Sequence, residues 1–473
     1  GTVNNASTLT LVGRDIVDGN GNTTTPGILV TGGTLSNPDG QINLVSVGLP
    51  QDLVKGGEIQ APSLTSAPAP SGHAFSTMGE ITLSRASLDT SGTTGGGVVI
   101  RGGQLTIDNG RITANKTGNT SDSPAGIDIK LDGAFALNLS EQILALDTQT
   151  FGAGDGGAVK IAASKVTLNY TGGEEGESIT VLSSGTGGAG KGGDVVITAT
   201  GEVNLNRVLI GTDTVGTGSA GSIVIKGENV TLTNSQISSS GVFGKGNSGA
   251  LEIEATSSVK LIGPSKVEST SGSGQLPGNV TITAKDLSMK DGAVITAHTQ
   301  GAGNAGNIII KADNLVIGGE SPLTGAFIRN DSIQGATGNA GSIDLSVGRL
   351  TLNPHSLFSS VSAGGGNAGT VEVHGLGGKG TAASAITLDN STISTVIAGG
   401  NSSSVPAGIK IAAQTVNLTN RAQITADTNG AAPAGNIALN VDTLMVGNFS
   451  TISSSSSLFD STAGNAGNIT IQG

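Results

Sequence analysis

The sequence predicts an all-β fold: a right-handed parallel β-helix, a solenoid with about 28–30 residues per coil, three short strands in each coil and essentially no helix. Three observations lead to this prediction. A glycine-rich phrase recurs along the chain, and aliphatic residues alternate with polar ones after each phrase. Aromatic residues make up only 2% of the sequence, so a core must be built from aliphatic side chains.

The recurring phrase reads Gly-Asn-Ala-Gly at 303–306, 338–341, 366–369 and 464–467. The last glycines of related phrases lie mostly 27–32 residues apart, and a few intervals of 35–39 residues indicate insertions. Glycine is favoured where the backbone takes a positive φ or where two backbones approach closely. We therefore expect one corner of each coil at these glycines, which include Gly221, Gly278, Gly306, Gly341 and Gly369.

The segment after each phrase carries the alternation typical of strands. In the unit that starts at residue 221, aliphatic residues occupy alternate positions within 223–225 and 230–232, and another follows at 237. Strands this short bury their apolar faces only by stacking on the equivalent strands of the next coil. The residues that we expect in the core include Ile223, Ile225, Val230, Leu232, Ile237, Val280, Ile282, Leu287 and Ile308.

Asparagine marks a second corner, after the second strand of the coil. The residues in this position are Asn109, Asn234, Asn353, Asn390 and Asn420. Asparagine tolerates the left-handed backbone region, and stacked asparagines can form a ladder of amides. Corner geometry is the favoured interpretation, and binding of a glycan or an ion by these amides is the alternative.

Composition excludes several classes of partner. The net charge is −12, and the 23 Lys and Arg residues are scattered along the chain. Nucleic acid needs a basic stripe, and an anionic membrane surface needs a basic cluster, so we expect neither as a partner. No apolar run approaches the ~18 residues of a membrane span, so we expect no membrane insertion. Cysteine is absent, so stability must come from stacking instead of disulfides.

No pattern of residues predicts a catalytic, metal or cofactor site. The strongest acidic cluster, Glu174, Glu175 and Glu177, lies in a glycine-rich segment without a nearby base. We interpret it as a solvated loop, and a contact loop is the alternative. The four histidines do not fall at equivalent positions of successive coils, which argues against a zinc site. Incidental calcium in an acidic loop stays open. The rival class is a β-helical polysaccharide lyase or hydrolase, which needs carboxylates and a base held together.

The chain divides into three regions by composition. Residues 1–60 start the β-helix, residues 61–96 form a Pro/Ser-rich excursion and a return to the coil, and residues 97–473 form the repetitive shaft. Excursions from the coil are expected at 61–75, 171–178, 319–327, 376–383 and 399–406. Insertions in repeat proteins map to surface loops, which often include the binding face. Neutral variation in loop length is the favoured interpretation of these insertions, and a binding face is the alternative.

The first region resembles a known family. Residues 9–16 read Leu-Thr-Leu-Val-Gly-Arg-Asp-Ile, residues 27–35 read Gly-Ile-Leu-Val-Thr-Gly-Gly-Thr-Leu, and residues 37–48 read Asn-Pro-Asp-Gly-Gln-Ile-Asn-Leu-Val-Ser-Val-Gly. These segments resemble the end of the secretion domain of filamentous haemagglutinin exoproteins, which leave the cell by two-partner secretion. The Gly-Asn-Ala-Gly units are similar to the repeats of such proteins. The Asn-Pro-Asn-Gly motif of the family is absent from this sequence.

The resemblance implies a function at the surface of a Gram-negative-type bacterium. The expected protein is secreted through an outer-membrane pore protein and forms a stiff rod for adhesion, a sheath or a biofilm. Its expected partners are host-cell, neighbouring-cell or matrix surfaces, including glycans. A head-to-tail extracellular filament is an alternative, because open coil ends expose strand edges that can pair end to end. We expect no enzymatic activity.

Overall fold

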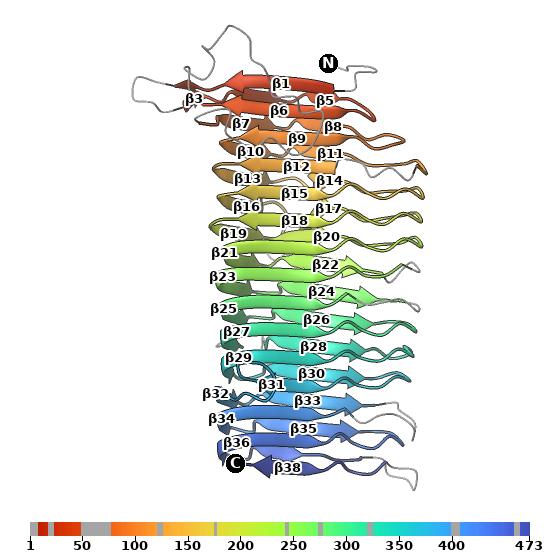
Figure 1. Cartoon of the computed structure of the whole chain (residues 1–473), viewed down its shortest axis with the longest axis vertical. Helices are drawn as coiled ribbons and strands as arrows, with labels where there is room; N and C mark the ends of the chain where they lie inside the picture. The colour runs from red at the N-terminus through yellow and green to blue at the C-terminus, as the bar shows by residue number, and fades with distance from the viewer. Residues whose placement is uncertain are drawn as a thin grey trace. The chain divides into compact units, whose positions relative to one another are not determined.

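The computed structural model describes residues 8–17, 23–48, 77–120, 126–174, 177–241, 246–272, 278–318, 325–398, 407–457 and 464–473. Within these ranges the fold is all-β, a parallel β-solenoid of about 13 turns, and no helix occurs. The chain divides into two compact units, Gly1–Val208 and Leu209–Gly473, in each of which the strands stack as successive coils (Figure 1). The regions 1–60, 61–96 and 97–473 stay a prediction, and residues 61–76 lie outside the described part.

Unit 1 keeps the three strands of each coil separate. Its strands are β1 (Thr8–Arg14), β2 (Ile16–Val17), β3 (Thr23–Thr25), β4 (Ile28–Thr31), β5 (Thr34–Ser36), β6 (Gln41–Val47), β7 (Glu80–Ser84), β8 (Ser87–Asp89), β9 (Gly97–Gly102), β10 (Gln104–Asp108), β11 (Arg111–Thr113), β12 (Gly126–Leu131), β13 (Ala134–Leu139), β14 (Leu146–Asp147), β15 (Val159–Ala163), β16 (Lys165–Tyr170), β17 (Ile179–Ser183), β18 (Val195–Ala199) and β19 (Glu202–Asn206). The short β2 and β3 pair antiparallel, whereas the coil strands pair parallel, as β9 does with β12.

Unit 2 joins the first two strands of most coils into one bent strand. Its strands are β20 (Val208–Gly211, whose first residue ends unit 1), β21 (Ile223–Thr233), β22 (Gln236–Ser240), β23 (Leu251–Ile262), β24 (Lys266–Ser271), β25 (Val280–Lys290), β26 (Val294–Thr299), β27 (Ile308–Ile317), β28 (Phe327–Ser332), β29 (Ile343–Leu352), β30 (Leu357–Ser362), β31 (Val371–His374), β32 (Ala383–Asp389), β33 (Thr392–Ile397), β34 (Ile409–Thr419), β35 (Gln423–Thr428), β36 (Ile437–Val446), β37 (Thr451–Ser453) and β38 (Ile469–Gln472). A register shift between Gly227 and Asn229 accommodates the bend in β21.

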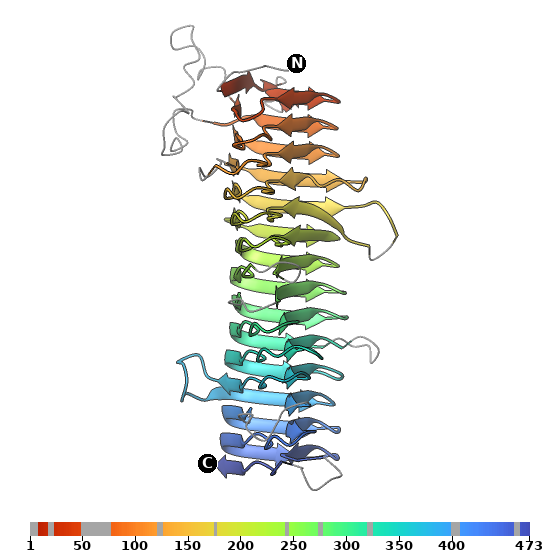
Figure 2. The same ribbon diagram turned by 90° about the vertical axis from the view of Figure 1, so that its right-hand side faces the viewer.

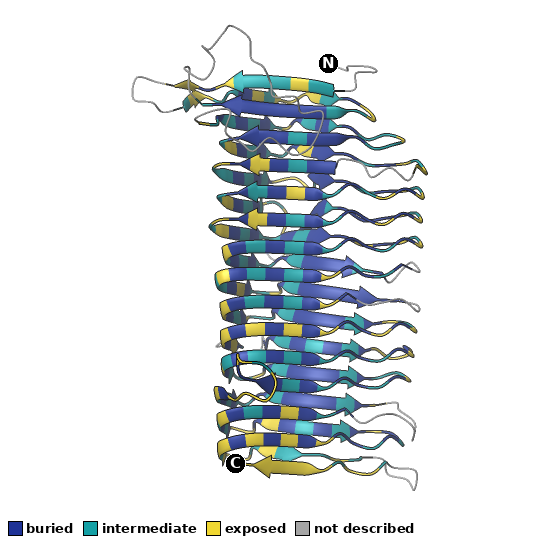
Figure 3. Cartoon of the chain, viewed as in Figure 1, coloured by how far each residue is buried: buried dark blue, intermediate teal, exposed yellow. Residues whose placement is uncertain are grey.

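Aliphatic ladders form the core of unit 2. The parallel register stacks like on like from coil to coil, in the order Ile223, Leu251, Val280, Ile308, Ile343, Val371, Ile409 and Ile437. All nine residues that the sequence placed in the core are buried, so the predicted alternation is confirmed. Figure 3 shows the resulting stripes of buried residues along the strands. Each such side chain contributes ~1.5–3 kcal/mol as an upper bound.

The predicted excursions are described only in part. Residues 61–75 and 399–406 lie outside the described ranges, and so do 175–176 of the second excursion and 319–324 of the third. The segment around 171–174 and the segment between β31 and β32 project from the coils (Figure 2). The latter closes on itself through a 2.8 Å hydrogen bond from the Gly375 amide to the Thr381 carbonyl oxygen.

Candidate functional site

The phrase glycines lie where successive coils touch. A Cβ built on Gly306 would lie 2.0 Å from the carbonyl oxygen of Gly278, and one on Gly341 would lie 2.0 Å from that of Gly306. Gly369 meets Gly341 at the same distance. None of these four glycines has a positive φ. Of the two reasons for glycine that the sequence left open, close stacking of backbones therefore applies at these corners.

The asparagines of the phrase connect neighbouring coils on the outside. The Oδ1 of Asn304 accepts the Asn339 amide at 2.9 Å, and the Oδ1 of Asn339 accepts the Asn367 amide at 2.7 Å. The residue after the phrase does the same, since Asn307 Oδ1 accepts the Ser342 amide at 2.9 Å. These bonds satisfy backbone N–H groups that the tight corner leaves without a strand partner.

Small polar residues of the third strand hold the same corner from the inside. The Oγ of Ser360 accepts the Gly369 amide at 2.7 Å and donates to the Gly341 carbonyl oxygen at 3.1 Å. Ser239 donates likewise to the Gly221 carbonyl oxygen at 3.3 Å. Sequence reasoning missed these residues. The signal for them was a serine, threonine or asparagine at an inward position of the third strand.

The asparagine corner adopts the left-handed backbone at four of its five predicted members. The φ angles are 48° at Asn109, 49° at Asn234, 42° at Asn390 and 54° at Asn420. Asn353 is the exception, because its φ is not positive. In that coil His355 adopts the left-handed conformation instead, with φ 64°. Pro354 separates the two, and its ring fixes φ near −65°, so the left-handed residue follows the proline.

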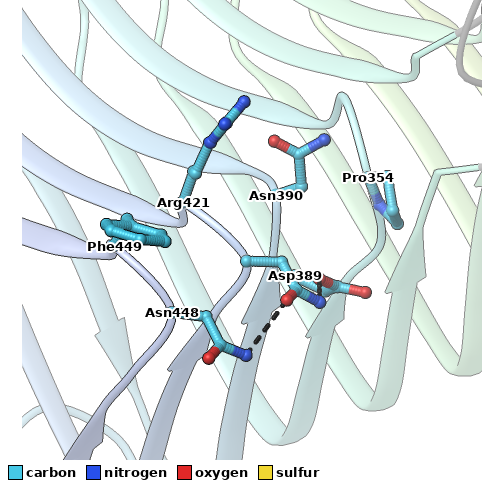
Figure 4. Close-up of a pocket in the computed structure, with 7 residues that line it drawn as sticks. Pro354, Asp389, Asn390, Arg421, Asn448 and Phe449 are labelled. Atoms are coloured by element: carbon cyan, nitrogen blue, oxygen red, sulfur yellow. Dashed lines mark hydrogen bonds between the residues drawn. The ribbon is translucent and has the colours of Figure 1, made fainter.

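Side chains at this corner form a short ladder in unit 2. The Nδ2 of Asn420 donates to Asp389 Oδ1 at 2.7 Å, and the Nδ2 of Asn448 donates to Asn420 Oδ1 at 3.2 Å. Figure 4 draws both bonds as dashed lines. The ladder orients one amide or carboxylate per coil and leaves further oxygen and N–H groups exposed to solvent.

The ladder lines an open cavity of about 490 Å³, which we call the corner groove. Its residues are Pro354, Asp389, Asn390, Asn420, Arg421, Asn448 and Phe449. Figure 4 shows the Arg421 side chain and the Phe449 ring projecting from neighbouring corners, with Asn390 and Pro354 on the other side. The groove thus combines an aromatic ring, a guanidinium group, amides and one carboxylate.

Phe449 occupies an unfavourable backbone conformation. Its φ is 64°, that of Asn448 is 52°, and the Ser450 amide bonds the Gly447 carbonyl oxygen at 3.1 Å. This is a type I′ turn, in which glycine is the favoured residue at the position of Phe449. A bulky residue there costs of order 1–3 kcal/mol. Even so, the ring is 90% exposed and gains little from burial.

The turn one coil earlier repeats this arrangement. Asn420 and Arg421 have φ of 54° and 67°, and the Ala422 amide bonds the Thr419 carbonyl oxygen at 3.1 Å. Among the described residues, no carboxylate forms an ion pair with Arg421. Two consecutive coils therefore hold large, exposed side chains at strained positions of one groove, which is typical of functional sites.

The predicted contact loop is fixed by an arginine. Arg207 Nε donates to the Glu177 carbonyl oxygen at 2.9 Å, and its guanidinium also donates to the Glu174 carbonyl oxygen. The same guanidinium lies 5.1 Å from the centre of the Tyr170 ring. The Glu177 carboxylate accepts the Glu174 amide at 3.2 Å. The loop therefore uses part of its polar surface internally, and Glu175 lies outside the described residues.

A second set of ionisable groups lies on the outer face of the third strands. His298 Nδ1 is 3.5 Å from Glu268 Oε1, and burial lowers the pKa of His298. Burial also raises the pKa of Asp331, which pairs in register with His298, to about 6, although Arg329 opposes the shift. The charges in this set partly neutralise one another, since Lys266 Nζ contacts Glu268 Oε2 at 2.6 Å.

The remaining histidines do not join this set. His73 lies outside the described ranges, His355 lies at the asparagine corner, and His374 Nε2 contacts Asp344 Oδ1 at 2.9 Å. In the described part of the chain, no group of three or more His, Asp or Glu residues is arranged to hold a metal ion. Over the same residues, no helix is long and apolar enough to cross a membrane.

Comparisons with known proteins do not assign this chain to a family. Neither a protein-family model, nor a curated protein, nor a solved structure matches this chain. The functional interpretation therefore rests on the solenoid, on the hydrogen bonds between its coils and on the corner groove.

Proposed function

We propose that this chain is part of a secreted structural and adhesive exoprotein, in which stacked coils form a stiff shaft at the cell surface. The observation that carries the proposal is the set of backbone contacts and hydrogen bonds that join successive coils at the corners formed by the Gly-Asn-Ala-Gly phrases. Backbone contacts at glycines such as Gly369, together with bonds from Ser360 and Asn339, connect each coil to its neighbours. Such bonding suits a protein whose work is mechanical.

The export route is proposed from the resemblance of residues 1–60 to secretion domains of filamentous haemagglutinin exoproteins. The proposed location is the extracellular surface of a Gram-negative-type bacterium, and the proposed export partner is an outer-membrane secretion pore. The proposed contact partners are host-cell, neighbouring-cell or matrix surfaces. Exposed polar groups of the corner groove support a contact role for the side of the coils that holds Asn390 and Asn420.

Surface display and adhesion can be tested directly. The gene would be deleted in the native bacterium and restored, and the exported product would be located by antibody on unpermeabilised cells. The proposal expects surface or medium localisation, and weaker attachment and biofilm of the deletion strain. Retention of the product inside the cell, or equal attachment of both strains, would overturn it.

A head-to-tail filament is a second candidate, because parallel strands pair from one coil to the next, as β36 does with β38, and the same pairing can join two copies. Ile469 and Ile471 continue the ladder of Ile437 and Leu439, but they are 43% and 52% exposed. These side chains are available to a further coil, whether it follows in the same chain or belongs to another copy. Electron microscopy of the native product decides between them, because continuous polymers favour the filament and separate rods of fixed length exclude it.

The proposal assigns no catalytic role. The purified chain would be incubated with acidic and neutral polysaccharides, and the reaction assayed for reducing ends and unsaturated ends. We expect neither above a no-protein control. New chain ends would establish the lyase or hydrolase alternative instead.

A further inference from the structure

We propose that the corner groove binds an acidic saccharide, with Arg421 holding the carboxylate and Phe449 stacking on the sugar ring. The inference rests on the proposed adhesive function and names the ligand class of its contact site. It starts from the two strained turns, because the chain places Arg and Phe where glycine would relieve strain and where neither side chain is buried.

Arg421 determines the charge of the ligand. Its guanidinium has five N–H donors, and no carboxylate of the described residues pairs with it. A planar guanidinium matches a carboxylate in a bidentate geometry. The only carboxylate of the groove, Asp389, already accepts the Asn420 amide at 2.7 Å. An anionic group therefore fits on the Arg421 side of the groove.

Phe449 and the amides determine the rest of the ligand. A ring that is 90% exposed offers an apolar face to one side of a pyranose ring, and its conformational entropy cost is low. The amides of Asn390 and Asn448 and the second oxygen of Asp389 match hydroxyl groups, which both donate and accept. A cavity of about 490 Å³ has room for one or two sugar rings. Uronic acid units carry all three features: a carboxylate, an apolar ring face and hydroxyls.

The test measures binding of a uronic acid oligomer, oligogalacturonate, to the whole chain by calorimetric titration. A neutral oligosaccharide of the same length is the ligand control. Arg421→Gln and Phe449→Gly each remove one proposed contact, and we expect at least tenfold weaker binding from each. Lys260→Gln removes an exposed charge on β23, and Phe151→Ala removes an exposed ring in unit 1. Neither control variant should change the affinity.

Thermal melting separates binding from folding. Glycine relieves the strained φ at 449, so Phe449→Gly should melt no lower than the wild-type chain although it loses the ligand. Raised salt should weaken binding of the wild type, because a charge pair contributes to it. The proposal is overturned if the wild type does not bind the oligomer, if the neutral oligosaccharide binds equally well, or if either groove variant binds like wild type. Attachment and localisation of the native product would then still stand as independent tests of the adhesive function.

Discussion

The amide of Gly369 donates a 2.7 Å hydrogen bond to the Oγ of Ser360, which is fully buried inside the coil. The same Oγ donates to the carbonyl oxygen of Gly341, the equivalent glycine one coil earlier. A residue of the third strand thus joins the corners of two coils. It explains why serine, threonine and asparagine recur at an inward position that alternation alone would assign to an aliphatic residue.

Ser360→Ala should destabilise unit 2 by about 1–3 kcal/mol, because the buried Gly369 N–H loses its acceptor. Urea unfolding followed by circular dichroism would measure the change. Ser288→Ala is the matched control, since this serine is half-buried and alternates in β25 with the buried Leu287 and Met289. Equal midpoints for Ser360→Ala and the wild type would show that the bond does not support the corner.

Gly369→Ala should destabilise by about 1–3 kcal/mol or more, because its Cβ would lie 2.0 Å from the Gly341 carbonyl oxygen. Gly365→Ala, four residues earlier, is the control. Its φ is not positive and its Cβ would meet no atom closer than 4.0 Å, so we expect a gain of about 0.4–1 kcal/mol. Thermal unfolding compares the two variants. A Gly369→Ala chain as stable as Gly365→Ala would refute close stacking as the reason for the phrase.

The contribution of Asp331 to stability should fall as the pH rises from about 4 to about 6, whereas that of His298, whose pKa is lowered by burial, has the opposite sign. Burial raises the pKa of its carboxyl from 3.8 to about 6, so the folded state favours the protonated form and loses that contribution at higher pH. The neighbouring groups are Arg329 on the same strand and His298 on the paired strand. A shift of this size corresponds to about 3 kcal/mol at most.

Asp331→Asn should remove this fall and stabilise the chain above pH 6. Urea unfolding at several pH values from 4 to 7 would show that the stability of the variant, relative to that of the wild type, increases as the pH rises to about 6. Asp442→Asn, at an exposed position of β36, is the control and should keep the wild-type slope. Parallel profiles for Asp331→Asn and the wild type would contradict the assignment.

The core was predictable from sequence, because alternation alone decides which side chains face inward. Residues such as Ile223 and Leu232 follow that rule, and both are buried. The sequence did not predict that the first two strands of a coil merge in unit 2. A bulge such as the one after Gly227 lets the hydrogen bonds continue through the bend. The same residues face inward with or without the bulge, so the alternation of the sequence does not reveal it.

The corner groove was only partly predictable. Asparagine signals a left-handed corner, and the sequence identified Asn390 and Asn420 on that ground. Arg421 and Phe449 carry no such signal, because type I′ turns favour glycine where they stand. Their proximity to Pro354 depends on the stacking of successive coils, which brings together residues that lie far apart in sequence. Sequence also could not decide between positive φ and close stacking at the phrase glycines, because glycine serves both needs.

The most direct test of the proposed modular shaft is the deletion of one whole coil. Removal of residues 278–305 joins residue 277 to Gly306, so Gly306 takes the place of Gly278. Strand β24 can then pair with β28 in the register that it now has with β26. The corner groove is left intact, and deletion of residues 278–291 is the half-coil control.

The measurement is thermal unfolding together with attachment of the exported chain to cells or matrix. We predict that the whole-coil deletion unfolds cooperatively near the wild-type temperature and attaches as the wild type does. The half-coil deletion should lose the cooperative transition at that temperature and should not attach. A whole-coil deletion that fails to fold, or that folds but no longer attaches, would contradict a shaft of interchangeable coils.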